Sequence, residues 1–397
     1  MDFKCKKPGG IYVHIPFCQK KCPYCDFYSI TDLSLKHRFL RALLGELERS
    51  RPEFLYFDTL YIGGGTPSVF DADQIRQVIE TVWRHFDVLP GAELTMEVNP
   101  GATTLEQLTG YIDAGINRLN IGVQSFQDPN LNFLGRIHSA NDAILAYEGA
   151  RRAGFDNVGI DLIYGLAKQT QDNWLIDLKS AVTLEPDHLS CYMLTYEPGT
   201  IFHQNWQSGT LQPLDDRRLK ELFDLTIAYL ETQGYVQYEI SNFARELGGN
   251  GPPKRSRHNL KYWSLTPYLG FGPSAHSFVE PKRYWNYSDV RRYISEIEAA
   301  RLPVADEEVL STEQLMMEVI FLSLRTIAGI DLDGFNHRFG MDFLDTFEET
   351  INDLEKRDLL RMVRNRCALT RKGLAFCDRI TSIFTSQEIE TELHTLY

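Results

Sequence analysis

Six short, β-branched apolar runs, each followed by a longer helical pattern, restrict the fold of this chain more than any other feature. The predicted strands span residues 11–17, 59–65, 94–100, 118–125, 157–165 and 188–195, and the clearest helical stretches between them span 36–49, 72–86, 104–114 and 140–153. Strands and helices that alternate in this way predict βαβ units and a parallel sheet. Six units favour an α/β fold with a partial, TIM-like (β/α)6 barrel over a doubly wound sheet.

The regular alternation ends near residue 245. A Gly/Pro loop signal at 248–253 is followed by aromatic-rich sequence up to about residue 287. From about residue 311 onward, three helical patterns, a short hairpin and a last helix predict a small winged-helix-like domain. We therefore expect a barrel over residues 1–245, a connecting segment over 246–305 and a C-terminal winged-helix-like domain over 306–397.

Charge and cysteine usage narrow the cellular setting. The net charge of −13 argues against broad nucleic-acid binding, which needs a basic surface. The sequence contains no run of eighteen apolar residues, so it predicts no membrane span. The first residues lack the apolar core of a secretory signal. The seven cysteines are an odd number and three are bunched, which does not suggest a disulfide framework. Free thiolates imply a reducing compartment, so we expect a cytoplasmic protein.

The bunched cysteines are Cys18, Cys22 and Cys25. Thiolates hold iron–sulfur clusters, normally four per cubane, so three would leave one iron open to an exogenous ligand. Structural zinc is the alternative, because His14 lies four residues before Cys18 and could complete a tetrahedral set. The local sequence indicates a metal and leaves both metals open.

Polar residues recur near the ends of the following strands. The segment GGGTPS at 63–68 would let a ligand approach the backbone closely. Glu97 alternates with apolar neighbours on the third predicted strand, and Gln124, Arg136 and Asp161 follow later. Any one of them could be a hydrogen-bonded core group. Their succession near strand ends, where such barrels keep their sites, favours a ligand site.

These motifs together resemble a known superfamily. The spacing CxxxCxxC after a first strand, followed by GGGTP, is similar to the radical S-adenosylmethionine (SAM) enzymes. The longer motifs YVHIPFCxxxCxYC, EVNP, GVQSF, DLIYGL and GFGPSAHSF resemble the oxygen-independent coproporphyrinogen III oxidase group, over about residues 10–276. The resemblance implies that Cys18, Cys22 and Cys25 hold a 4Fe–4S cluster, whose open iron takes the amino and carboxylate groups of SAM.

The resemblance also implies which residues contact SAM, with one or two SAM molecules bound. The residues that match contacts to the SAM at the cluster are Tyr12, Gly64, Gly65, Thr66 and Glu97. Those that match contacts in the two-SAM arrangement of the family are Tyr24, Gln124, Arg136, Asp161 and Thr195. Ala275 and His276 are implied to lie near the adenosyl group.

Two departures separate the chain from the oxidase itself. The oxidase continues its cluster motif with a further cysteine, where this chain has Phe27, and it carries a long N-terminal arm, where this chain has about ten residues. Both features are missing from a paralogous branch, the HemW-type radical SAM haem chaperones. That branch adds the signature HNxxYW, which this chain has at 258–263.

The HNxxYW segment supplies groups suited to haem. A histidine such as His258 is a common axial ligand of haem iron, and aromatic rings can stack on the porphyrin. Nearby basic residues (Lys254, Arg255, Arg257 and Lys261) would suit the propionates. An aromatic loop with a hydrogen-bonded histidine and solvated charges is the alternative. With the resemblance, we expect haem-binding residues separate from the SAM site, namely His258, Asn259, Tyr262 and Trp263.

Two functions follow as hypotheses. The first is a haem chaperone that holds the cluster and SAM, binds haem and transfers it to haem-accepting proteins such as respiratory cytochromes. Transient contact with membrane-bound acceptors and a homodimer belong to this hypothesis. The second is the oxidase itself, which decarboxylates coproporphyrinogen III to protoporphyrinogen IX. Phe27 and the short N-terminus favour the first, so we expect no oxidase activity.

Overall fold

The computed structural model describes residues 7–50, 56–246 and 252–385. The predicted loop signal at 248–253 therefore lies outside the described residues except for its last two positions. The first six residues of the predicted barrel and the last twelve residues of the predicted C-terminal domain also lie outside them. None of the described helices is long and apolar enough to cross a membrane.

A single curved sheet of 12 strands forms the body of the protein, in the order β12-β11-β10-β9-β1-β2-β3-β4-β5-β6-β8-β7. Its six central strands are parallel: β1 (Gly9–Ile15), β2 (Tyr56–Gly64), β3 (Asp87–Val98), β4 (Arg118–Gln124), β5 (Val158–Tyr164) and β6 (His188–Met193). All six predicted strands are confirmed. The sheet stays open, because β12 and β7 each pair with one neighbour, and the predicted partial barrel is confirmed as well.

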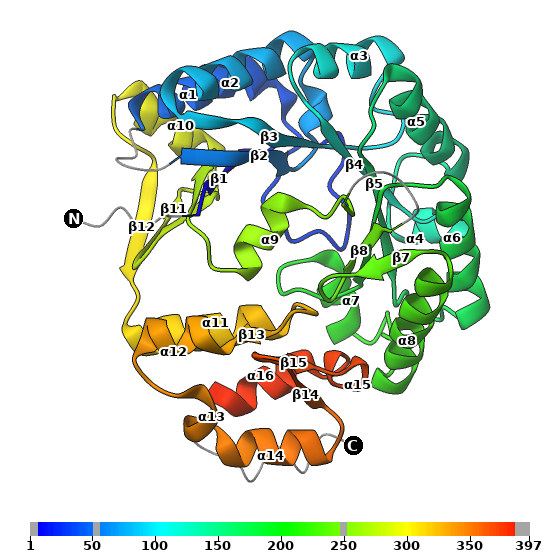
Figure 1. Ribbon diagram of the computed structural model, residues 1–397. Coiled ribbons are helices and arrows are strands. Elements are labelled where there is room, and N and C mark those ends of the chain that lie inside the picture. Colours follow the sequence, from blue (N-terminus) through cyan, green and yellow to red (C-terminus); the bar gives the residue numbers. More distant parts are fainter. Residues whose placement is uncertain (1–6, 51–55, 247–251, 386–397) are drawn as a thin grey trace.

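Helices cover the convex face of the sheet (Figure 1). They are α1 (Lys36–Arg49), α2 (Ala72–His85), α3 (Leu105–Asp113), α4 (Asp128–Phe133), α5 (Ala140–Ala153), α6 (Gln171–Thr183) and α8 (Asp216–Thr232). Local sequence fixes where several begin, because Asp71, Thr104 and Ser139 form capping boxes at the starts of α2, α3 and α5. Their apolar faces pack on the strands and form the main hydrophobic core.

Both flanks of the sheet extend beyond the predicted barrel. On one side β8 (Asn242–Arg245) runs antiparallel to β6, and β7 (Tyr235–Gln237) pairs with β8. On the other side β9 (Tyr268–Phe271) runs parallel to β1, followed by β10 (His276–Val279), β11 (Lys282–Asn286), α10 (Val290–Glu298) and β12 (Val304–Val309). The region predicted as a connecting segment over 246–305 thus contributes β9, β10 and β11 to the sheet, and β12 crosses the boundary expected at residue 306.

The C-terminal unit contains the predicted helices and hairpin. Its elements are α11 (Thr312–Leu324), β13 (Ile330–Asp331), α12 (Leu332–Phe339), α13 (Phe343–Thr346), α14 (Glu348–Lys356), β14 (Leu360–Val363), β15 (Arg366–Leu369), α15 (Arg371–Leu374) and α16 (Cys377–Thr385). The hairpin β14–β15 and β13 form a three-stranded sheet. Buried Phe335, Phe343, Leu354 and Ile380 supply its core. The unit faces the open side of the curved sheet (Figure 1), where α11 contacts α9 (Arg257–Trp263).

Candidate cofactor site

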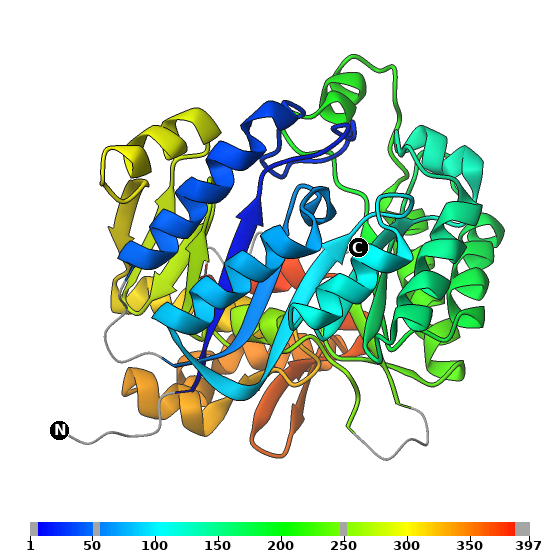
Figure 2. The same cartoon turned by 90° about the horizontal axis from the view of Figure 1, so that it is seen from above.

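The three bunched cysteines lie on the loop that follows β1. The Cys18 N–H donates to the Ile30 carbonyl (2.9 Å), and the Cys25 N–H donates to the Cys22 carbonyl (3.2 Å). All three thiols are free and half-buried. Figure 2 shows this dark-blue loop at one end of the sheet, next to the green segment that contains α7 (Ile201–Gln207). The Phe202 N–H donates to the Pro23 carbonyl (3.0 Å) and ties the two segments together.

Groups from other strands approach the cysteine sulfurs. The Thr66 hydroxyl donates to Cys18 Sγ (3.5 Å), and the Arg136 guanidinium donates to Cys22 Sγ (3.7 Å). A Cβ atom at Gly65 would lie 2.6 Å from the Phe17 carbonyl oxygen and 3.0 Å from Cys18 Sγ. Only glycine therefore fits at this position. Donors that face the sulfurs stabilise thiolates, the form that binds iron.

The tetrahedral zinc alternative does not fit this geometry. His14 is buried, its Nδ1 shares a hydrogen bond with the Tyr12 hydroxyl (3.0 Å), and its Nε2 pairs with the Tyr28 carbonyl (2.8 Å). Within the described ranges, no three or more His, Cys, Asp or Glu side chains are grouped so that they could hold one metal ion. Three free thiols on one loop, with donors around them, suit a larger cluster better than a single zinc ion.

A cavity of about 520 Å³ opens beside the cysteine loop. It is lined by Cys25 and by nine of the twelve residues that the resemblance implied for SAM: Tyr24, Gly64, Gly65, Thr66, Glu97, Gln124, Arg136, Asp161 and Thr195. These residues come from six different strands or the segments after them, so only the folded sheet brings them together.

Two carboxyl groups face this cavity. Glu97 Oε1 accepts a hydrogen bond from the Tyr61 hydroxyl (2.7 Å), and Oε2 accepts one from the Gly64 N–H (3.2 Å). Burial, with a contribution from the nearby Asp161, raises the pKa of Glu97 to about 7. Burial likewise raises the pKa of Asp161 to about 6, and its buried Oδ1 has no hydrogen-bond partner in the described structure. Unpaired buried acceptors fit a ligand that carries donors and positive charge.

Three of the implied SAM residues do not line the cavity. The Tyr12 hydroxyl bonds to His14. Ala275 is buried just before β10, and the exposed ring of His276 stacks on Trp285 (5.5 Å between ring centroids). Since β9 separates β10 from β1, this segment lies beyond the edge of the parallel strands. The structure therefore places Tyr12, Ala275 and His276 outside the cavity lining, and their implied contacts with SAM stay predictions.

Several residues that were not predicted also line the cavity, namely Tyr61, Asn99, Asn120 and Tyr192. Asn99 connects two predicted ones, since its Nδ2 donates to Thr66 Oγ1 (2.9 Å) and its Oδ1 accepts from Arg136 (2.7 Å). Strand alternation could have found two others. Tyr61 precedes Gly63 by two positions and Asn120 precedes Gln124 by four, so each shares a sheet face with a residue already singled out.

The HNxxYW segment forms α9, and the fold does not present His258 as an open haem ligand. The side chain is 1% exposed; its Nδ1 pairs with the Thr59 hydroxyl (2.8 Å) and its Nε2 with the Tyr262 hydroxyl (2.9 Å). Burial lowers the pKa of His258 to about 3, so the ring is neutral. Both nitrogens are engaged, and neither is free to bind iron. The expected haem-ligand role of His258 stays a prediction, and it would require one of these two hydrogen bonds to break.

Two other residues of this segment have contacts within the protein. The Asn259 N–H donates to Ser256 Oγ (3.3 Å), and Arg325 lies over the Trp263 ring (5.6 Å to its centroid). Three of the four basic charges are paired, because Arg257 and Lys261 both reach Asp58, and Lys254 reaches Asp187 (3.1 Å). The fourth, Arg255, lies over the Tyr238 ring (5.8 Å to its centroid).

Comparison with known proteins assigns the family. The model described as "Radical SAM superfamily" matches residues 12–180, and the "HemN C-terminal domain" model matches residues 310–376. The protein named Heme chaperone HemW of Bacillus subtilis (strain 168) is 32% identical, over 95% of this chain and 99% of that protein. The one of Mycobacterium tuberculosis (strain H37Rv) is 33% identical, over 94% of each. This chain belongs to the HemW family of radical SAM proteins.

Solved structures agree with this assignment. Coproporphyrinogen III oxidase (HemN) from Escherichia coli, described as a radical SAM enzyme, superposes with a TM-score of 0.81 and 26% identity, over 96% of this chain and 90% of that chain. A 4Fe–4S cluster and SAM are the typical cofactors of the radical SAM family, so membership implies both for this HemW-family chain.

Proposed function

We propose that this HemW-family chain is a haem chaperone, which binds haem and transfers it to haem-accepting proteins. The observation that carries the proposal is similarity to proteins named haem chaperone over nearly the whole length of both chains. Phe27 supports it, because it stands where the oxidase motif has a further cysteine and lies 69% exposed at the cavity.

The cofactor site is part of this proposal. Cys18, Cys22 and Cys25 would hold the 4Fe–4S cluster, which supplies an electron for the reduction of SAM when both are bound. Thr66 and Arg136 donate to the thiolates, and Glu97 and Asp161 offer carboxylates to a cationic ligand. The glycines after β2 leave room for that ligand to approach the backbone. A second SAM molecule stays a prediction.

The setting and partners follow from the same proposal. Acceptors would be haem proteins such as respiratory cytochromes, reached by transient contact when they are bound to membranes. A cytoplasmic location would keep the three thiols reduced and available for iron. Self-association as a homodimer belongs to the proposal and is measurable by sedimentation.

Oxygen-independent coproporphyrinogen III oxidation is the second candidate. It is favoured by the fold shared with the Escherichia coli oxidase and by a cavity large enough to accept part of a porphyrin rim. Phe27 weighs against it, since this side chain takes the place of a cysteine at the cavity.

The decisive experiment measures both activities on one preparation. Protein reconstituted without oxygen is titrated with haem, and the Soret band is followed before and after an apo-cytochrome is added. In parallel, coproporphyrinogen III and SAM are supplied under reducing conditions and protoporphyrinogen IX is measured. Haem binding and transfer without porphyrin conversion are expected. Efficient conversion without haem transfer would make the chain an oxidase.

A further inference from the structure

The HNxxYW helix α9 closes the barrel at the end opposite the cysteine loop. In Figure 2 the cysteine loop lies at the tips of the strand arrows, and the yellow-green helix lies toward their starts. The residues that hold α9 agree with this position, because Thr59 and Glu93 lie near the beginnings of the segments of β2 and β3 that lead to Gly64 and Glu97.

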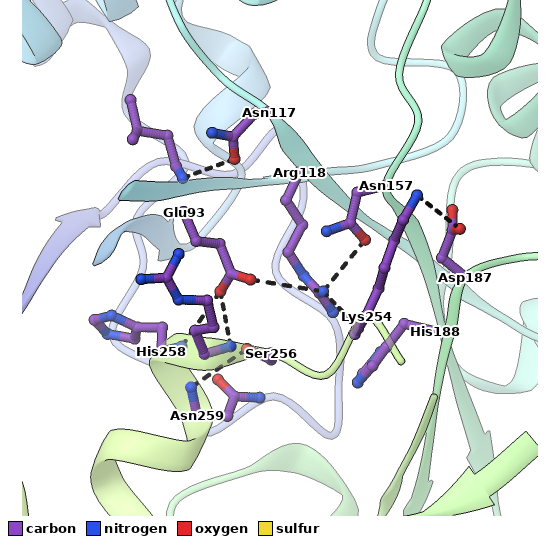
Figure 3. Close-up of polar contacts among 12 residues, drawn as sticks. Glu93, Asn117, Arg118, Asn157, Asp187, His188, Lys254, Ser256, His258 and Asn259 are labelled. Carbon is purple, nitrogen blue, oxygen red and sulfur yellow. Dashed lines mark hydrogen bonds and ion pairs between the residues drawn. The ribbon is translucent and has the colours of Figure 1, made fainter. Parts of the chain in front are cut away.

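Buried charges fix the start of this helix (Figure 3). The Glu93 carboxylate accepts hydrogen bonds from the backbone N–H groups of Arg257 (2.9 Å) and His258 (3.3 Å). Arg118, which is 0% exposed, lies 3.9 Å from Glu93 and donates to the Lys254 carbonyl (2.9 Å). A carboxylate at a helix N-terminus is favourable, and a buried charge needs such a partner. The helix is therefore docked by the interior of the barrel.

The docked helix places the His258 ring against a cavity residue. Its ring stacks on Tyr61, with centroids 5.2 Å apart and planes inclined by 30°. Hydrogen bonds to Thr59 and Tyr262 on either side set the ring orientation. Together these contacts define one position for the His258 ring.

Tyr61 links the His258 ring to Glu97 in the cavity. Its ring rests on His258, and its hydroxyl donates to Glu97 Oε1 (2.7 Å), while the Gly64 N–H holds the other carboxylate oxygen. A phenol confined on one face by a stacked ring has less freedom to leave the carboxylate, so the donor is preorganised. One continuous series of contacts therefore runs from β2 through α9 to the cavity. Its members are Thr59, His258, Tyr61 and Glu97.

We propose that the HNxxYW helix is the floor of the SAM site, and that His258 and Tyr61 are positioning residues that hold Glu97 in place for SAM. The inference rests on the proposed SAM contact of Glu97. It gives the histidine of the signature a role in cofactor binding, whereas the sequence had suggested a haem ligand in a separate site.

Equilibrium binding of SAM to the anaerobically reconstituted full chain tests this role. Tyr61→Phe keeps the ring and removes only the donor to Glu97, so the dissociation constant should rise about ten-fold, as for loss of one hydrogen bond to a charged group. His258→Ala removes the ring beneath Tyr61 and should weaken SAM binding by a similar factor. His258→Phe restores an aromatic surface and should recover part of the loss. Haem titration of each variant is measured alongside.

Arg257→Ala is the matched control, because it removes the ion pair with Asp58 from the same helix without touching Tyr61. It should leave SAM affinity within about two-fold of wild type, because the Arg257 side chain is 44% exposed and Lys261 still pairs with Asp58. If His258→Ala fails to fold, Tyr61→Phe and His258→Phe still decide the matter.

The outcomes separate this inference from the proposed function. Unchanged SAM affinity in Tyr61→Phe and His258→Phe, with haem affinity lost in His258→Phe, would overturn the positioning role and restore the haem-ligand role. Weakened SAM binding with wild-type haem affinity is the expected result. A wild-type protein that binds haem but no SAM would overturn this inference, because the inference requires SAM to contact Glu97. The proposed chaperone function would still stand.

Discussion

SAM binding should depend on pH through Glu97. The folded protein raises the pKa of this carboxyl to about 7, mainly because it is buried, so it is largely protonated at pH 6 and largely ionised at pH 8. A cationic ligand favours the ionised form. With a pKa of about 7, the ionised fraction rises from about one tenth to about nine tenths over this interval, so the affinity contributed by Glu97 should increase about ten-fold.

Glu97→Gln supplies the baseline for this measurement, because the α-amino group of SAM itself titrates near pH 8. The pH dependence that the wild type shows beyond this variant belongs to Glu97. Equilibrium dialysis against labelled SAM, at constant ionic strength and without oxygen, measures both profiles. Identical profiles for the wild type and Glu97→Gln would refute the reasoning, because an amide does not titrate.

A second test uses the neighbours of Glu97, because they shift its pKa in opposite directions. The hydrogen bond from Tyr61 lowers the pKa of Glu97, and Asp161 raises it. Tyr61→Phe should therefore move the midpoint of the profile to higher pH, by up to about one unit, since one pKa unit corresponds to about 1.4 kcal/mol. A midpoint that stays in place while affinity falls would mean that Tyr61 acts on SAM binding by another route.

Further predictions concern iron, activity and stability. Replacing Cys18, Cys22 or Cys25 by Ala should remove the iron bound after anaerobic reconstitution, which elemental analysis measures; iron retained at wild-type levels would contradict the cluster assignment. The chain should not restore growth to a strain that lacks the anaerobic oxidase, and robust growth would favour the oxidase function. Glu93→Ala should lower the unfolding free energy by about 3–5 kcal/mol, because Arg118 stays buried without its partner; Glu93→Gln should cost less, and equal urea midpoints for both would argue against a charge effect.

Much of the central fold could be predicted from the sequence, because short local patterns specify its strands and helix ends. The six parallel strands are short β-branched runs, and helices α1 and α5 have the predicted ends, the latter set by a Ser139 capping box. The flanking strands were missed because they span three to six residues each and have no alternation long enough to recognise. β9 illustrates the difficulty, since its partner β1 lies more than 250 residues earlier in the chain.

The cofactor site was predicted in large part because its residues stand at strand ends, which parallel strands gather at one edge. Nine of twelve implied SAM residues meet at one cavity for this reason. Ala275 and His276 did not, because they lie immediately before and at the start of β10, which runs antiparallel at the flank of the sheet. Tyr61 was missed although its strand was predicted, because an aromatic residue in an apolar run also fits the core.

The hydrogen bonds of His258 show which contacts of a motif residue can be predicted from sequence. A hydroxyl four residues later on a helix lies on the same face, so the pairing of Tyr262 with the imidazole follows from the spacing of HNxxYW itself. The partner on the other side, Thr59, is 199 residues away in the chain and becomes visible only in the folded barrel. A histidine can bind haem iron only when one of its nitrogens has no competing partner. In this chain Tyr262 of the motif and Thr59 of β2 engage both nitrogens of His258, so haem ligation would have to displace one of them. Our proposal instead assigns these residues to holding α9 beneath the cofactor site.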